Sequence, residues 1–527
     1  MRITNKIMQR NSLSNINSNK ELQDNLTTQM STQKKINRAS DDPVVAIRAL
    51  RLRSNVTEVT QYYSKNIPDA DSWLKVTEDA LKNTSEIITK MIEQSTRGSN
   101  GDLTSDDRKI IIEQLTALGD EVYKTGDASY AGRYVFTGYR TDTSLSFQED
   151  RKDKTYNITE QLDKSVIDSI THIYTDAIDG WTSANFSSAA MSGVTEVDIT
   201  QFPINRIRLA YNNLDDIAAA DIKINYTDTA GNPQSLTATS VGLSTDPATY
   251  DVFDPTNTSY DPDAIVLVRD TGELLIGENA YAALMATRDN PSTPTTDESE
   301  IRITYEKTDF TADDLRPEHY YACSARDAGT ALGDTSQIDY NQDYLNGIVE
   351  KQSIEYDVGF NQTIKINSTA DEAYNLGIGR EVDDLVSALQ RVQNMEDLRD
   401  NIKKKLDITT NDADKDILQN QLDTAEKALA FEKEVCQKRF ERSITTFQKY
   451  LDDASLAITN VGTRSSKLEL IQSRMQNQKT TFETLRSENE DIDITEVAIQ
   501  LSSSEMTYQA ALTATGKIIQ NTLLNYI

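Results

Sequence analysis

The stretch Ile36-Asn37-Arg38-Ala39-Ser40-Asp41-Asp42-Pro43 opens a long heptad pattern that continues to Met91. Asp42 can accept hydrogen bonds from the first N–H groups of a helix, and Pro43 suits the first helical position, where its missing N–H costs nothing. Apolar or small residues then recur on one helical face: Ala46, Ala49, Val56, Tyr63, Ile67, Ala70, Leu74, Thr77, Leu81, Thr84, Ile88 and Met91. From Tyr63 the spacing alternates between four and three, which is the coiled-coil period. Such a seam predicts a partner helix of similar length.

A matching heptad pattern lies near the other end of the chain. Helical periodicity returns at Glu381, breaks near Thr409-Thr410-Asn411 and continues past Arg486. Its last part has apolar residues at heptad positions: Val461, Leu468, Ile471, Met475, Phe482 and Leu485. We expect this seam to pair with that of Tyr63 to Met91 in an antiparallel rod, because an intramolecular partner has a high effective concentration. Two separate coiled coils, each formed with another molecule, are the alternative.

Both ends of the chain carry weaker apolar stripes. Residues 1–35 contain Ile3, Ile7, Leu13, Ile16, Leu22, Leu26 and Met30 among many polar residues. The C-terminal stripe consists of Val497, Leu501, Tyr508, Leu512, Ile519 and Leu523. Isolated helices of this kind are marginal in water, and exposed apolar ends are a liability unless something buries them. We therefore expect both ends to fold on assembly.

The middle of the chain has a different character. After a helix beginning at Thr104 or Ser105 and a short β-hairpin at Ala131–Tyr139, residues 141–375 favour short strands separated by Asp, Asn, Gly and Pro. The expected strands are Tyr156–Ile158, Val194–Ile199, Ile222–Tyr226, Ala264–Val268, Ile301–Tyr305 and Ile364–Ile366, with a helix at Glu278–Asp289. The predicted fold is mainly α with an inserted β-rich domain. Its parts are residues 1–42 with 487–527, residues 43–140 with 376–486, and residues 141–375.

Composition excludes several classes of function. The 527 residues include 54 Lys+Arg and 84 Asp+Glu, a net charge of −30, so nucleic acid is not expected as a partner. Residues 1–60 are an exception at +5, either a solvated arm or one that docks on acidic neighbours. No window approaches a membrane span or a secretory signal. Cys323 and Cys436 are expected to be buried thiols rather than a disulfide.

No catalytic, metal-binding or cofactor-binding pattern is present. His172 and His319 are the only histidines, too few for a multi-histidine metal site, and we expect both to be structural. Trp73 and Trp181 are expected to be packing residues. The sequence contains no phosphate-binding loop and no nucleophile motif. We expect neither catalysis nor a cofactor.

Several motifs resemble the bacterial flagellin family. The Ile36–Pro43 octapeptide resembles the signature that opens the long helix in flagellins and their relatives. The opening Met1–Thr4, Arg48–Ser54, Trp73-Leu74 with Thr77-Glu78, and Gly132–Tyr139 resemble the hook-associated members of that family. Asp491–Glu496 and Asn521–Leu524 are similar to its C-terminal end. The middle of the chain, and the charged helix around Asn394–Arg442, do not fit the family pattern.

The resemblance implies a structural protein of the flagellum that forms the junction layer between hook and filament. It implies inner and middle helical layers, and contacts with the preceding hook-associated protein, with flagellin and with copies of itself in a ring-like layer. It also implies an export chaperone and type III export without a cleavable signal, giving an extracellular flagellar protein. The expected interface residues are the terminal stripes, the heptad seams, and Arg38, Asp41, Asp42 and Pro43, which would fix the bend between layers. Alternatives are a flagellin that polymerises into the filament, and an adhesin or binding module on the β-rich head.

Overall fold

A computed structural model describes residues 5–101, 103–175, 178, 181–182, 184–186, 193–217, 222–242, 248–287, 301–346 and 352–520. The chain divides into two compact units. Unit 1 comprises Met1–Asp71, Tyr356–Ile364 and Ser465–Ile527, and unit 2 comprises Ser72–Glu355 and Lys365–Arg464. The fold is mostly helical with a central β-rich region, which confirms the predicted fold class.

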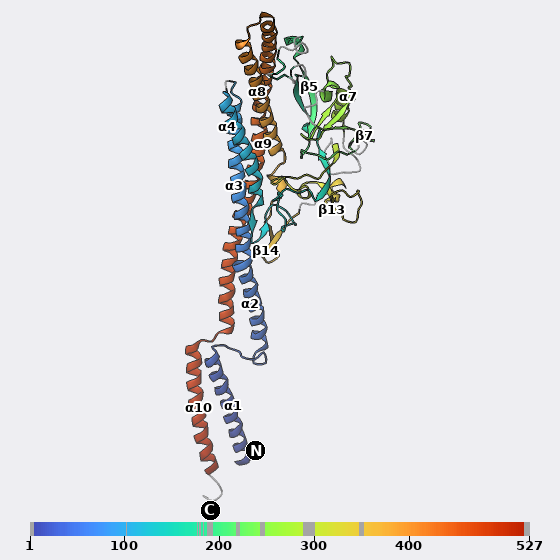
Figure 1. Ribbon diagram of the computed structural model, residues 1–527. Coiled ribbons are helices and arrows are strands. Elements are labelled where there is room, and N and C mark those ends of the chain that lie inside the picture. The colour runs from blue at the N-terminus through green and yellow to red at the C-terminus, as the bar shows by residue number, and fades with distance from the viewer. Residues whose placement is uncertain are drawn as a thin grey trace, which may run out of the picture. The chain divides into compact units, whose positions relative to one another are not determined.

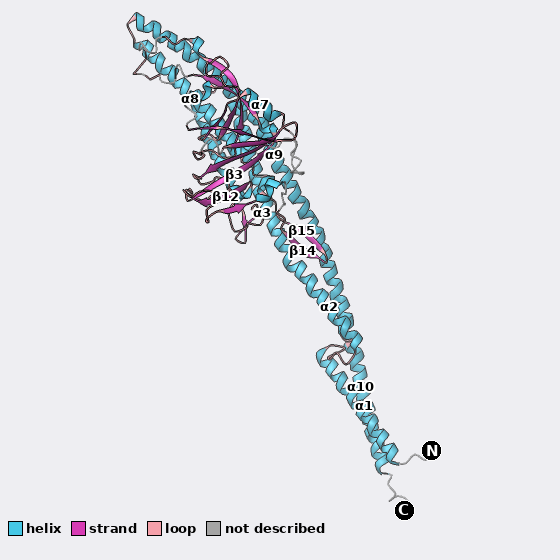
Figure 2. Cartoon of the chain, turned by 90° about the vertical axis from the view of Figure 1, so that its right-hand side faces the viewer, coloured by secondary structure: helices cyan, strands magenta, loops and turns pink. Residues whose placement is uncertain are grey.

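Unit 1 is built from the two ends of the chain. Its helices are α1 (Asn5–Thr32), α2 (Pro43–Gln61), a π-helical turn η1 (Tyr62–Asn66), the start of α3 (Ile67–Gly98), the end of α9 (Asp412–Glu490) and α10 (Ile494–Gln520). Helices α1 and α10 lie side by side, as Figures 1 and 2 both show. The predicted cap of α2 is confirmed, because Asp42 accepts hydrogen bonds from the N–H groups of Val44 and Val45 at 2.9 and 3.1 Å.

A β-hairpin adds an aromatic contact to unit 1. Strands β14 (Glu355–Gly359) and β15 (Gln362–Lys365) pair with each other, and the second overlaps the strand predicted at Ile364–Ile366. The Phe360 ring in their turn contacts two other rings. Its centroid lies 5.8 Å from that of Tyr62 in η1 and 6.4 Å from that of Phe482 in α9. Edge-to-face aromatic pairs of this kind stabilise beyond their buried area.

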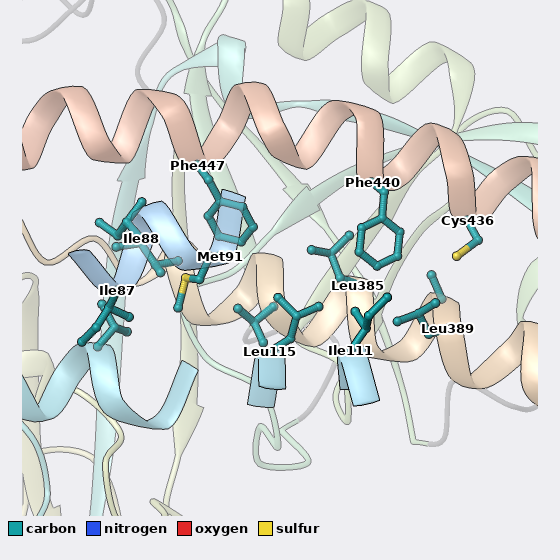
Figure 3. Packing of buried hydrophobic residues seen from close by; sticks show 14 of the residues in the cluster. Ile87, Ile88, Met91, Ile111, Leu115, Leu385, Leu389, Cys436, Phe440 and Phe447 are labelled. Atoms are coloured by element: carbon teal, nitrogen blue, oxygen red, sulfur yellow. The ribbon is translucent and has the colours of Figure 1, made fainter. Parts of the chain in front are cut away.

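The helices of unit 2 enclose its main hydrophobic core. They are the rest of α3 and α9, α4 (Ser105–Lys124), a 3₁₀ turn η2 (Thr125–Asp127) and α8 (Gly377–Ile408). As predicted, α4 begins after Thr104, which forms a capping box with Asp107. Figure 3 shows side chains from the four helices meeting in one core, among them Ile88, Met91, Ile111, Leu115, Leu385, Leu389, Phe440 and Phe447.

Two β-sheets complete unit 2 and lie along one side of α8 and the unit 2 part of α9 (Figure 1). The six-stranded sheet has the order β13-β12-β3-β11-β6-β7 and the five-stranded sheet the order β4-β5-β10-β9-β8. All neighbours are antiparallel except β8 and β9, and Tyr305 pairs with Ile158 in the larger sheet. The first sheet consists of β3 (Lys154–Leu162), β6 (Lys223–Thr227), β7 (Pro233–Thr237), β11 (Ile301–Lys307), β12 (Ala322–Asp327) and β13 (Ile338–Tyr340). The second consists of β4 (Asp168–Tyr174), β5 (Thr200–Arg208), β8 (Thr239–Val241), β9 (Ile265–Val268) and β10 (Glu273–Ile276).

Short helical elements join these strands. They are η3 (Lys164–Val166), η4 (Glu196–Asp198), α6 (Ala248–Asp251), α7 (Glu278–Met285), η5 (Pro317–His319), η6 (Gln342–Asn346) and η7 (Ala370–Glu372). The predicted helix at Glu278–Asp289 is therefore present but shorter, and Asp289 lies outside the described residues.

Two local predictions need correction. The predicted strand Val194–Ile199 is wrong: η4 forms there, because Thr195 and Asp198 make a capping box that bends the chain. The hairpin predicted at Ala131–Tyr139 pairs β1 (Ser129–Tyr130) with β2 (Arg133–Tyr134) instead. Its turn is set by Ala131 and Gly132, whose φ values are +51° and +77°.

The core that α3 shares with α9 extends beyond the predicted partner stretch. Within unit 2, Ile88 and Met91 pack with Phe440, Phe447 and Ala454, which precede the predicted partner stretch Val461–Phe482. Leu485 is exposed, although it stands at a heptad offset from that stretch. The unplaced segment Asn394–Arg442 forms the end of α8 and the start of α9, where Ile402, Leu418 and Leu422 form a second core with Trp181.

Candidate assembly interface

The two connections between consecutive helices in unit 1 are bonded to each other. Helix α1 ends at Thr32 and helix α9 ends at Glu490, and the chain segments that follow lie together. The Lys35 N–H donates to the Glu490 carbonyl at 2.7 Å, and the Ile492 N–H donates to the Gln33 carbonyl at 3.2 Å. Because both helices are interrupted at the same level, the bend involves both segments at once. We call this pair of connections, residues 33–42 and 491–493, the linker pair.

A buried carboxylate holds the linker pair together. The Glu490 side chain is 4% exposed and accepts hydrogen bonds from Nε and Nη2 of Arg53 at 2.6 and 2.8 Å. Lys34 Nζ lies 3.6 Å from the same carboxylate and also pairs with Asp491. Burial opposes the charge on Glu490, but the Arg53 hydrogen bonds and the positive charges of Arg53 and Lys34 outweigh burial and lower its pKa.

The predicted bend residues organise the first linker locally. Asp41 accepts hydrogen bonds from the N–H groups of Arg38 and Asn37 at 2.8 and 3.1 Å, and these bonds lower the pKa of its carboxyl. Asp42 and Pro43 begin α2, as described above. On the opposite linker, Asp493 accepts from the N–H groups of Thr495 and Glu496 at the start of α10. Side-chain caps therefore fix both points at which the helices resume.

The seam between α1 and α10 is mostly polar. In α1 the least exposed residues recur at intervals of three and four: Gln9, Ser12, Ile16, Asn19, Gln23, Leu26 and Gln29. In α10 the corresponding residues are Val497, Leu501, Ser504, Tyr508, Ala511 and Thr515. Both rows have the coiled-coil period, but the α1 row contains only two large apolar side chains.

Many large apolar side chains of these helices are exposed instead of lying in that seam. Exposed ones in α1 are Ile7, Met8, Leu13, Leu22 and Met30, and in α10 they are Ile494, Ile499, Met506 and Leu512. Helix α2 adds Val44, Ile47 and Leu50. A single exposed leucine is ordinary, but exposed large apolar residues are here concentrated on three helices of one unit, as is expected of a surface that partners cover. We call these residues the apolar face of unit 1.

The predicted interface residues fall into two groups. Leu74, Leu81, Ile88, Met91 and Val461 are buried in unit 2, and Leu26, Leu468, Ile471 and Met475 are buried in unit 1 with Phe482 half-buried. Ile7 and Leu512 are exposed. Ile3 and Leu523 lie outside the described residues, and so does the side chain of Ile519. The buried heptad residues pack the chain internally, whereas Ile7 and Leu512 belong to the apolar face.

The part of the apolar face that lies on α2 could have been predicted from the sequence. Val44, Ile47 and Leu50 alternate with the buried Ala46 and Ala49 of α2. An apolar row out of phase with the main seam indicates a second contact surface on the same helix. The pairing of Arg53 with Glu490 had no such signal, because 437 positions separate the two residues.

The residues expected to be structural are internal. Cys323 and Cys436 are free, buried thiols, which confirms the prediction. Trp73 and Trp181 are buried, and His172 stacks on Tyr250 with ring centroids 3.9 Å apart. Burial lowers the pKa of His172 to about 4. Among the residues that the structure describes, no helix is long and apolar enough to cross a membrane and no cluster of side chains could hold a metal ion.

Comparisons with known proteins find similarity between part of this sequence and one family. Residues 3–141 match the bacterial flagellin N-terminal helical region. Flagellar hook-associated protein 3 of Salmonella typhimurium is 28% identical over 145 residues, which are 27% of this chain and 45% of that protein. The Escherichia coli protein of the same name is 30% identical over 158 residues, 29% of this chain and 50% of the relative. The chain thus spans about half the length of these relatives.

Two further matches cover larger shares of this chain. A Bacillus subtilis flagellin is 27% identical over 210 residues, 39% of this chain and 67% of that flagellin. A solved structure of a putative flagellar hook-associated protein from Vibrio parahaemolyticus is 13% identical, covers 86% of this chain and all of its own, and has a TM-score of 0.33. The sequence matches fall on flagellar proteins, and residues 3–141 contain the Ile36–Pro43 signature and the linker that precedes α2. Residues 3–141 of this chain are therefore similar to the N-terminal helical region of bacterial flagellins.

Proposed function

We propose that this chain is a structural protein of the bacterial flagellum that forms the junction layer between hook and filament. The flagellin family is a structural family and not an enzymatic one. Two of the matched relatives carry the name flagellar hook-associated protein 3, which supports the junction assignment over other flagellar roles. Unit 1 is the part that assembles.

The observation that supports the proposal is that α1 and α10 meet through many polar residues while several of their large apolar side chains are exposed. Within the chain this pair is joined by a mostly polar row, whereas Leu13, Leu22 and Met506 are left in water. Fully burying one such side chain stabilises by roughly 1.5–3 kcal/mol. Neighbouring subunits that cover the apolar face would therefore contribute more to the order of this pair than its own seam does.

The partners follow from this surface. Copies of the same chain would cover part of it within a ring-like layer, and the preceding hook-associated protein and flagellin would cover the rest. The Arg38–Pro43 stretch and the Glu490 contacts would fix the bend between a terminal layer (residues 1–42 with 487–527) and a rod (43–140 with 376–486), with residues 141–375 as an inserted head. Before assembly, an export chaperone would shield the apolar face on the type III export route to an extracellular position on the flagellum.

Electron microscopy of purified protein added to isolated hooks and, separately, to filament fragments tests the proposal. We expect a short collar on hook ends that stops growing. The variant Leu13→Glu should lose the collar, because it places a charge on the apolar face. Leu332→Glu is the matched control, since Leu332 is equally exposed, on unit 2. No association of the wild-type chain with either structure, or equal loss in both variants, would refute the assignment.

A flagellin that polymerises into the filament is the second candidate. The Bacillus subtilis flagellin is matched over 67% of its length, a larger share than for either hook-associated protein. The same microscopy separates the two functions, because a flagellin would extend filament fragments into long filaments instead of forming a collar.

A further inference from the structure

A cavity of about 760 Å³ lies in unit 2 between a sheet edge and helix α9. Strand β4 stands first in its sheet, so one of its edges has no neighbouring strand among the described residues. Residues of β4, β5 and α8 line one side of the cavity. The α9 side is lined by Lys438, Arg439, Arg442, Thr445 and Lys449, whose spacing places them on one helical face. Phe440 and Phe447 face the core instead, so α9 separates this polar cavity from the apolar interior.

The cavity reverses the charge balance of its surroundings. Unit 2 contains 38 Lys+Arg and 68 Asp+Glu, so acidic side chains dominate it. The cavity lining contains seven Lys and Arg residues against five Asp and Glu residues. Cationic side chains therefore outnumber carboxylates in the cavity lining, although carboxylates outnumber cations in unit 2 as a whole.

Four of the five carboxylates of the lining accept hydrogen bonds, whereas Asp453 of α9 has no hydrogen bond or ion pair to a described residue. Asp384 accepts from Nη2 of Arg206 at 2.6 Å and from Nη1 of Arg208 at 2.8 Å. Arg208 also donates to Glu381 at 2.8 Å, and Asp168 pairs with Arg206 at 3.2 Å. These ion pairs connect β5 to α8 and β4. Asp168 also pairs with Arg442 of α9, so these four carboxylates offer Arg439 and Lys449 little further acceptor capacity.

Two cations of α9 have little or no compensation. The Arg439 side chain is 15% exposed, and its one ion pair in the described chain is with Asp384 at 3.5 Å, a carboxylate that Arg206 and Arg208 share. Burial and the positive charges of Arg206 and Arg391 lower the pKa of Arg439 despite Asp384. Lys449, nearly three turns further along α9, lines the same cavity and has no ion pair to any described residue. A guanidinium in this position is energetically costly unless an anion completes its hydrogen bonds.

We propose that this cavity binds a small multivalent oxyanion of the phosphate, sulfate or carboxylate class, held by Arg439 and Lys449 with the Thr445 hydroxyl as a further donor. Arginine and lysine are the side chains that proteins use for such anions, one as a planar fork and one as a point charge. The site belongs to unit 2 and does not depend on the assembly role of unit 1.

Isothermal titration of the full chain with sodium phosphate, sodium sulfate and sodium citrate, each at ionic strength matched with NaCl, tests the site. We expect saturable binding of at least one anion, and the three titrations identify which class is preferred. Lys449→Gln should weaken that binding about fivefold to tenfold, the range of a single charge-assisted hydrogen bond in a solvent-accessible site. Lys449 is exposed and has no ion pair to lose, so the variant should fold normally.

Lys467→Gln is the matched control. Lys467 is another exposed lysine of α9 that does not line the cavity, so its replacement changes the net charge equally. Unchanged affinity in Lys467→Gln with reduced affinity in Lys449→Gln would support the site. Absence of saturable binding at matched ionic strength would overturn the proposal, and so would equal affinity of the two variants.

Discussion

Replacing Glu490 by glutamine should loosen the linker pair without unfolding the protein. The substitution keeps the shape of the side chain but removes the charge that receives two hydrogen bonds from Arg53 and faces Lys34. A buried pair can cost several kcal/mol to break, but the side chain of Arg53 is 56% exposed, so water compensates for much of the loss. We expect a cost of about 1.5 kcal/mol for the local contact.

Amide hydrogen exchange measures this cost directly. The N–H groups of Lys35 and Ile492 are bonded across the linker pair, so both must exchange through its opening. A loss of about 1.4 kcal/mol corresponds to roughly tenfold faster exchange at these two amides. Amides of the unit 2 core should not change, because additivity holds for distant sites.

The control is Glu488→Gln, two residues away. The Glu488 side chain is exposed and its carboxylate makes no hydrogen bond or ion pair with a described residue, so this variant should exchange like the wild type. Acid should have the same effect on the linker pair as Glu490→Gln. The pKa of Glu490 in the folded state lies below its ordinary value of 4.5. The stability that this carboxylate contributes is therefore present above pH 4.5 and is lost as the pH falls through the lowered pKa. Unchanged exchange at Lys35 and Ile492 in the glutamine variant would refute the role of this carboxylate.

Four further outcomes are expected. Phe440→Ala should cost unit 2 about 3–5 kcal/mol in urea unfolding, because Phe440 is fully buried, whereas the exposed Leu456→Ala should cost almost nothing. Burial raises the pKa of Glu160 to about 7, so the stability that Glu160 gives unit 2 is fully present below pH 4.5 and is lost as the pH rises to 7. In Glu160→Gln, the melting temperature of unit 2 should therefore change less between about pH 5 and 8 than in the wild type. Limited proteolysis of dilute monomer should remove roughly the first and last 35 residues before residues 45–480 are cut, and protected ends would contradict assembly-coupled folding. Collar formation on hooks should increase from 0.02 to 0.2 M NaCl, because salt screens the acidic unit 2, and a decrease would mean that charge attraction drives assembly.

The helical framework was predictable because each of its signals is local. Asp42 with Pro43, and Thr104 with Asp107, define helix starts by side chains within three residues of the backbone groups that they cap. The seam from Ile67 to Met91 is readable for the same reason, since its period is set by one helix. The strand predicted at Val194–Ile199 failed where two local signals competed, apolar alternation and a capping box, and the side-chain hydrogen bonds of Thr195 and Asp198 prevailed.

The candidate interface was less predictable because it depends on which of two rows a helix buries. The apolar stripe of α1 contains Leu22 and Leu26, and no feature of the sequence distinguishes which of the two is buried. In the structure Leu26 is buried against the rest of unit 1 and Leu22 is exposed. Only the position of α10 decides between them, and the pairing of residues far apart in sequence has no local signature. The contact of Arg53 with Glu490 was missed for the same reason.

The distribution of charge gives the polar seam a physical meaning. Unit 1 contains 16 Lys+Arg and 16 Asp+Glu, so it is formally neutral and the whole charge of −30 belongs to unit 2. If copies of the chain assemble as proposed, like charges on unit 2 would repel, whereas unit 1 would bring an apolar face and no net charge to oppose contact. If the large side chains of α1 and α10 faced each other instead, the pair would be stable alone and its outer surface would have little to offer a neighbour. In α1 only Ile16 and Leu26 lie inside, and Ile7, Met8, Leu13, Leu22 and Met30 lie outside. This arrangement would make the order of the pair depend on partners that cover it.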